Sequence, residues 1–84
     1  MMEQIWVETY SGYKADQEPR AFHVEGKRIE VEEVLGCRRI YDVEDGRVYV
    51  RYKVMAEDGR IYEISLDERE GIWYLIRSRR SDER

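Results

Sequence analysis

The sequence has very few of the residues on which small catalytic and metal centres depend. It contains one cysteine, one histidine and one proline. Cys37 has no partner for a disulfide within the chain, and the further ligands of a cysteine-based zinc site are missing. His23 is accompanied by no serine or cysteine motif typical of nucleophilic catalysis. We therefore expect no cofactor, no metal site and no enzymatic activity, with Cys37 as a packing residue and His23 on the solvent side of a strand.

Long apolar runs are also missing, so no stretch is long enough to span a bilayer as a helix. The N-terminal residues MMEQIWVETY lack the basic region and apolar segment of a signal peptide. Among the 84 residues, 42% are apolar and 40% are charged, which suits one small core with a heavily solvated surface. We expect a single cytoplasmic domain over residues 1–84 without membrane association, in which residues 79–84 form a frayed tail.

Helical periodicity is nearly absent, whereas alternation of apolar and polar residues recurs along the chain and predicts an all-β protein. The first predicted strand covers residues 4–10, with Ile5 and Val7 on one side and Trp6 on the other. A polar segment over residues 11–19 holds the only proline and is predicted to be a loop. The stretch AFHVEGKRIEV then predicts a hairpin that turns at Gly26 and places Phe22 opposite Ile29.

After this hairpin the alternation slips by one residue, because the expected inward position falls on Glu33 while apolar residues follow at Val34 and Leu35. Such a slip predicts a β-bulge in a continuing strand. A short helix over residues 31–36, ended by Gly36, remains the alternative.

The clearest hairpin joins RVYVRYKV to RIYEISL around Gly59. A three-residue loop with Gly59 in a left-handed conformation places Val54 opposite Tyr62 and Lys53 opposite Glu63, which satisfies both faces of the pair. A two-residue loop would instead bury polar groups. With the flanking strands, the chain predicts six or seven short antiparallel strands curled into a small barrel or roll.

The last apolar segment, IWYLIR, is apolar on both sides. If Ile72, Tyr74 and Ile76 face the core, the neighbouring residues are left on the outer face. The resulting cluster is typical of a protein-interaction or self-association surface, such as that of a homodimer. Its predicted members are Met55, Ile61, Trp73 and Leu75. The alternative is a barrel closed by the N-terminal strand, with Trp6 covering Trp73.

The strand RVYVRYKV places a row of cationic and aromatic side chains on its outer face. The net charge of −4 argues against a uniformly basic surface but allows a local stripe. Cations beside an aromatic ring suit single-stranded nucleic acid, because phosphates are neutralised while bases stack on the ring. The candidate nucleic-acid-binding residues are Arg47, Tyr49, Arg51, Lys53 and Arg77. The alternative is the ordinary solvated face of a strand, since Glu63 neutralises part of it.

Three functional hypotheses follow from these patterns. The first is a non-enzymatic binding module, accessory to nucleic-acid transactions, that uses the basic and aromatic stripe. The second is a protein-interaction module that uses the apolar cluster. The third is a small enzyme with a polar site near Tyr13, Lys14 and His23, which only a cavity between these residues would support.

Two stretches, YSGYKADQEPRAFHVEGKRIEVEEVL and MAEDGRIYEISLDEREGIWYLI, resemble a small bacterial domain of unknown function. In that domain a Tyr-Ser-Gly-Tyr-like opening precedes a Pro-Arg-x-Phe strand, and an Asp-Gly-x-Tyr hairpin follows. The resemblance covers Tyr10 to Ile76 and implies a short stand-alone protein, similar to segments attached to translesion (Y-family) DNA polymerases. It implies no activity. The chain departs from this pattern after Leu35, where Gly36, Cys37 and Arg38 replace an acidic residue, an arginine and a tryptophan.

Overall fold

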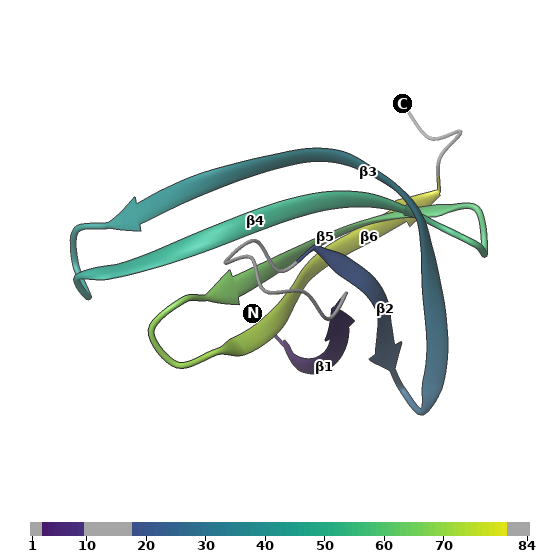
Figure 1. Ribbon diagram of the computed structural model, residues 1–84, viewed down its shortest axis with the longest axis horizontal. Helices are drawn as coiled ribbons and strands as arrows, with labels where there is room; N and C mark the ends of the chain where they lie inside the picture. The colour runs from purple at the N-terminus through teal and green to yellow at the C-terminus, as the bar shows by residue number, and fades with distance from the viewer. Residues whose placement is uncertain (1–2, 10–17, 81–84) are drawn as a thin grey trace.

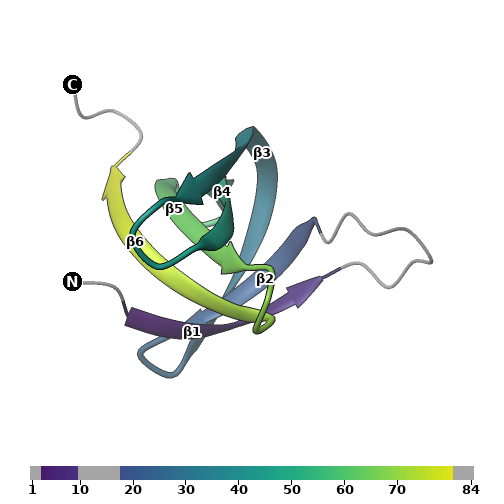
Figure 2. The same cartoon turned by 90° about the vertical axis from the view of Figure 1, so that its left-hand side faces the viewer.

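A computed structural model describes residues 3–9 and 18–80 of the chain. These residues contain no helix, and six antiparallel strands, each paired with the next in the chain, close into a barrel (Figures 1 and 2). The prediction of an all-β antiparallel barrel is confirmed, with six strands. They are β1 (Glu3–Thr9), β2 (Pro19–Val24), β3 (Lys27–Asp42), β4 (Arg47–Ala56), β5 (Arg60–Asp67) and β6 (Ile72–Arg80).

The barrel closes because β1 changes its partner halfway along its length. Residues Glu3 to Ile5 pair with β6, whereas Trp6 to Thr9 pair with β2. Figure 2 shows β1 lying between β2 and β6. The short N-terminal strand therefore covers what would otherwise be two unpaired sheet edges.

The strand β3 is 16 residues long and forms with β4 a hairpin that extends past the rest of the barrel (Figure 1). Its pairing with β4 shifts between Val31 and Glu33 and again between Val34 and Gly36. The predicted bulge is confirmed, and the alternative of a helix over residues 31–36 is wrong. Continuous pairing with β4 satisfies the backbone, and the bulges absorb the slip in alternation.

Both predicted hairpin registers are confirmed. Phe22 pairs with Ile29 in the β2–β3 hairpin, while Val54 pairs with Tyr62 and Lys53 with Glu63 in the β4–β5 hairpin. Gly59 has a φ of 79°, which allows the bulged turn that the three-residue loop requires. Turn chemistry and the alternation of side chains therefore determine these registers together.

The prediction for β6 is wrong, because Trp73 is buried with 6% exposure and Leu75 packs against the core. The cause is a register shift in β6. Arg77 pairs with Glu63 on the outer face, but Leu75 already pairs with Ile64, so one extra residue lies between them. Because of this bulge, each residue that precedes it in β6 points to the opposite face of the sheet from the one that was predicted. The strand also continues through Arg79 and Arg80, which corrects the predicted start of the tail; residues 81–84 lie outside the described part of the chain.

One aromatic-rich core fills the barrel. Phe22 meets Tyr62 edge to face with ring centroids 4.8 Å apart, and the centroids of Tyr52 and Trp73 are 5.6 Å apart. The buried core residues are Ile5, Val7, Phe22, Ile29, Tyr52, Val54, Ala56, Tyr62, Ile64, Leu66 and Trp73. Every strand contributes to this cluster, so the loss of one large side chain affects the whole barrel.

The turn between β2 and β3 contains a strained residue. Glu25 has a φ of 52°, a left-handed conformation that asparagine and glycine adopt at lower cost than glutamate. We expect Glu25→Asn to raise the free energy of unfolding by about 1 kcal/mol, measured by urea denaturation. Glu44→Asn makes the same change in an exposed turn residue whose φ is not positive and should have little effect. Equal effects of the two variants would contradict the assignment of strain to Glu25.

Candidate functional site

A hollow on the outer surface of the barrel collects cationic side chains from three strands. It has a volume of about 370 Å³, and we call it the basic groove. Its lining residues are Gly36, Cys37 and Arg38 from β3, Arg51 and Lys53 from β4, Glu63 from β5 and Arg77 from β6. Four cations and one carboxylate face this groove, so it is positive although the chain has a net charge of −4.

The bulges in β3 bring Arg38 into the groove. After the shift at Val34, Gly36 pairs with Lys53 and Arg38 pairs directly with Arg51. Two like charges opposite each other in an antiparallel pair destabilise the sheet. The fold therefore places two arginines at directly opposite positions of the ladder in spite of their like charges, and an anion bound in the groove would reduce this repulsion.

The Arg51 side chain has an unusual environment for a surface cation. Its Nε atom is buried and has no hydrogen-bond partner within the described part of the protein. Its cross-strand partner on β5, Ser65, is itself buried with 1% exposure. A buried N–H group of a charged side chain without an acceptor costs free energy.

Glu63, the one carboxylate that lines the groove among the described residues, is only a partial counterion. Glu63 forms an ion pair with Arg77, whose Nε atom lies 3.1 Å from Oε2 of Glu63. Glu63 also lies opposite Lys53 in the β4–β5 ladder. The Arg77 side chain remains 69% exposed. One carboxylate shared by two cations leaves the positive charge of Arg38 and Arg51 uncompensated within the groove.

Two of the five predicted binding residues do not line this groove. Arg47 donates from Nη1 to Oδ2 of Asp67 at 2.6 Å, and its Nη2 lies 3.9 Å from the Glu70 carboxylate. The hydrogen bond that Arg47 donates to Asp67 raises the pKa of Arg47, which keeps it charged as a structural partner. Tyr49 donates to Oδ2 of Asp45 at 3.1 Å, and burial, followed by this carboxylate, raises its pKa.

Tyr49 instead belongs to a second hollow that adjoins the basic groove, with a volume of about 510 Å³. We call it the aromatic hollow. Arg51 lines both hollows, and Tyr41, with 63% exposure, is the most accessible ring beside it. The other lining residues are Ile40, Asp42, Val43, Glu44 and Ser65. Arg51 therefore lies where the basic groove and the aromatic hollow meet.

The sequence identified Arg51, Lys53 and Arg77 but missed Arg38 and Tyr41. Both missed residues follow the bulges of β3, where alternation no longer shows which face a side chain takes. The adjacent arginines of CRRIY are the only local signal of a basic contribution from this strand.

The structure does not assemble the predicted apolar interaction cluster. Met55 and Ile61 pair with each other on the outer face and are half-buried. Trp73 is in the core, and Leu75 packs against it from inside the barrel. The prediction that these four side chains form one exposed surface is wrong, because the bulge in β6 turns two of them inward.

The residues of the enzyme hypothesis are only partly within the described chain. His23 lies on the outer face of β2 but is half-buried, with Nε2 3.0 Å from Oε2 of Glu8. Tyr13 and Lys14 lie outside the described residues. Cys37 is exposed in the basic groove, which contradicts its assignment as a packing residue.

Comparison with known proteins gives no relative: no family model, no curated protein and no solved structure matches this chain. Within residues 3–9 and 18–80, no helix is long and apolar enough to cross a membrane. The same residues contain no group of three or more histidine, cysteine, aspartate or glutamate side chains placed to hold a metal ion.

Proposed function

We propose that the protein is a non-enzymatic module that binds single-stranded nucleic acid through the basic groove. The observation that carries this proposal is the charge of the groove, in which four cations from three strands face one carboxylate among the described residues. Guanidinium groups bind phosphate oxygens with directed N–H donors.

A polyanion suits the groove better than an isolated anion does. The cations come from β3, β4 and β6, so they are spread over a stretch of four neighbouring strands. Successive phosphates of a nucleic-acid backbone would contact them in turn, and release of counterions would favour the association. Glu63, which lies between Lys53 and Arg77 in the sheet, would limit the attraction there.

The aromatic hollow favours a single strand over a duplex. If the phosphate of a nucleotide is bound at Arg51, the base of that nucleotide would reach Tyr49 and the exposed ring of Tyr41 in the adjoining hollow. Bases stack on such rings only when they are not already stacked and paired within a helix.

Anisotropy titration of a fluorescently labelled oligothymidine at several salt concentrations tests this proposal. If Arg38, Arg51, Lys53 and Arg77 each neutralise one phosphate, the logarithm of the binding constant falls with the logarithm of salt concentration with a slope of about −2.8. The double variant Arg51→Ala, Arg77→Ala should bind at least tenfold more weakly and show a slope of about −1.4.

The matched control is the double variant Lys27→Ala, Arg69→Ala, which removes the same charge from exposed residues outside the groove. It should bind like the original protein. A duplex of equal length should bind more weakly than the single strand. Equal losses in the two double variants, or no saturable binding at low salt, would refute a binding site in the basic groove.

A further inference from the structure

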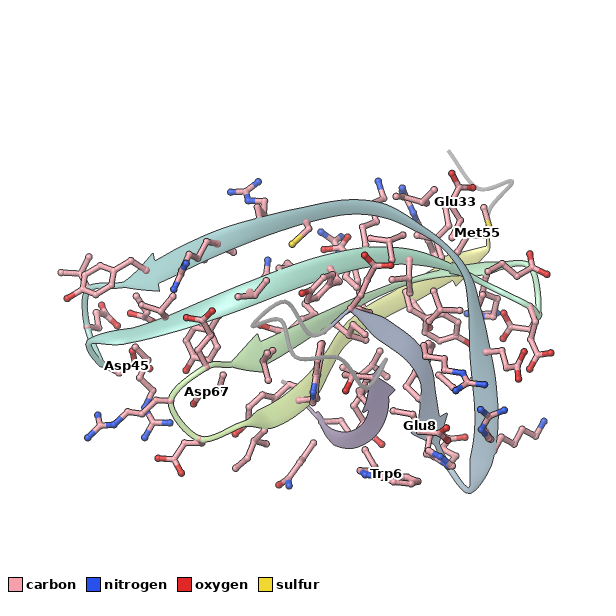
Figure 3. The ribbon with its side chains drawn as sticks, in the orientation of Figure 1. Trp6, Glu8, Glu33, Asp45, Met55 and Asp67 are labelled. Carbon is pink, nitrogen blue, oxygen red and sulfur yellow. The ribbon has the colours of Figure 1, made fainter. Side chains whose placement is uncertain are left out.

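A second surface of the barrel displays an exposed tryptophan. Trp6 lies on the outer face of β1 and is 65% exposed. Figure 3 shows Trp6 and Glu8 at one edge of the molecule, and Glu33 and Met55 at the opposite edge. Large aromatic side chains on a surface are the most frequent anchors of protein interfaces. This surface uses none of the residues of the basic groove.

The Trp6 ring is held in place by a chain of contacts. It stacks on His23 with ring centroids 4.5 Å apart, and Nε2 of His23 lies 3.0 Å from Oε2 of Glu8. Arg28 donates to both oxygens of Glu8, at 2.7 and 3.0 Å, and a further hydrogen bond joins Arg28 to Glu30 at 2.8 Å. The hydrogen bonds from Arg28 and His23 lower the pKa of Glu8 to about 2, so this support persists at neutral pH.

Such support matters for binding, because a side chain that is ordered before a partner arrives loses less conformational entropy in the complex. An exposed tryptophan without a supporting contact would sample several rotamers. Trp6 instead presents its indole in one orientation while most of its surface remains accessible.

A hollow of about 700 Å³ adjoins Trp6 where β1 changes from β6 to β2. Its apolar lining includes Ile5 and Ile72, and its charged lining includes the carboxylates of Glu3 and Glu25. Among residues 3–9 and 18–80, none of the side chains that line this hollow is a lysine or an arginine. The hollow therefore combines an apolar wall, an aromatic ring and negative charge.

We propose that this hollow binds a lysine or arginine side chain from a basic segment of a partner protein. Long cationic side chains bury their aliphatic stems against apolar surface while the charged end stays near water and counterions. The stem would lie along Ile5 and Ile72, and the charged group would face the indole of Trp6 near the carboxylates of Glu3 and Glu25. Cations bind preferentially over the face of tryptophan among the aromatic residues.

Because the two surfaces carry opposite charges, each of them favours a ligand that the other repels. The carboxylates beside Trp6 repel phosphates, whereas the basic groove repels a cationic peptide. The protein would thus hold a basic protein segment on one side and a polyanion on the other, and each site can be tested without the other.

Titration of the full chain with a blocked peptide that contains three lysines separated by alanines tests the proposal. We expect saturable binding that shifts the indole N–H resonance of Trp6 in NMR spectra. Both Trp6→Ala and Trp6→Leu should weaken binding at least fivefold, since leucine keeps an apolar side chain but lacks an aromatic face. The double variant Glu3→Gln, Glu25→Gln should weaken it to a similar extent.

Two controls separate the proposed site from general attraction to an acidic protein. The double variant Glu32→Gln, Glu44→Gln removes the same charge from exposed residues outside the hollow and should leave the affinity unchanged. The corresponding peptide with three glutamates should not bind. Equal weakening by both double variants, full affinity in the Trp6 variants, or the absence of saturable binding would each overturn the proposal.

Discussion

Replacement of Trp73 by alanine is expected to lower the free energy of unfolding by about 3 to 5 kcal/mol, the usual cost of removing a large buried aromatic side chain. Trp73 is 6% exposed and pairs with Leu66 on one side and Ile5 on the other, at the point where β1 closes the barrel. Its loss would leave a cavity at this closure. Since small domains have a total stability of about 5 to 15 kcal/mol, urea denaturation should show a large decrease or complete unfolding.

Trp6→Ala is the matched control, because it removes the same side chain from the outside of the barrel. Trp6 is 65% exposed and its ring contact is with His23, so we expect a loss below about 1 kcal/mol. A Trp73→Ala variant that keeps its stability but changes the molecular mass in solution would contradict the core assignment. That result would restore the hypothesis of a self-association surface.

The second large effect is expected at Asp67, whose carboxylate is buried at the end of β5. Its Oδ2 accepts the Arg47 hydrogen bond at 2.6 Å, and its Oδ1 accepts the backbone N–H groups of Arg69 and Glu70 at 3.0 and 3.3 Å. Asp67→Ala should cost about 3 kcal/mol, at the low end for a broken buried ion pair because Arg47 is one-third exposed. Urea denaturation at pH 7 measures this loss.

The pH dependence of this contribution has a definite sign. Burial alone raises the pKa of Asp67, but the hydrogen bonds from Arg47 and from the turn outweigh it, and the pKa is lowered. A lowered pKa in the folded state means that the unfolded chain binds the proton more readily. The stabilisation is therefore complete above the unfolded pKa of about 3.9 and declines as the pH falls through the lower folded value.

Asp67→Asn separates the charge from the turn, because the amide oxygen can still accept the two backbone N–H groups. We expect the stability difference between Asp67→Asn and the original protein to be largest at neutral pH and to shrink below about pH 4. Glu70→Gln should have little effect at any pH, since its carboxylate is 3.9 Å from Arg47 and 45% exposed. A difference for Asp67→Asn that does not change with pH would refute the ion pair as its source.

These contacts give Arg47 a structural role instead of the binding role that its place in the stripe predicted. Charge reversal at Arg47 would place two carboxylates against each other near the β5–β6 turn and would impair folding before it reported on any ligand. Arg51 and Arg77 are the better test positions, because their charged groups line the groove without supporting a turn.

The sequence by itself determined the features that depend on neighbouring residues. Alternation predicted the all-β class, and the turns at Gly26 and Gly59 predicted both hairpin registers, down to Lys53 opposite Glu63. These registers are readable because a one-residue slip would move every apolar side chain to the wrong face. Arg51, Lys53 and Arg77 could be grouped for the same reason.

Only the tertiary structure decided the features that depend on bulges and distant partners. One extra residue in β6 turned Trp73 into the core, and the bulges in β3 placed Arg38 opposite Arg51. Likewise, Arg47 is neutralised by Asp67, a residue 20 positions away. The alternation of apolar and polar residues cannot reveal a bulge within a strand that is apolar on both faces. In such a strand, no polar residue marks the face that points to the solvent. Which of these side chains point into the barrel depends on the strand that pairs with them when the barrel closes.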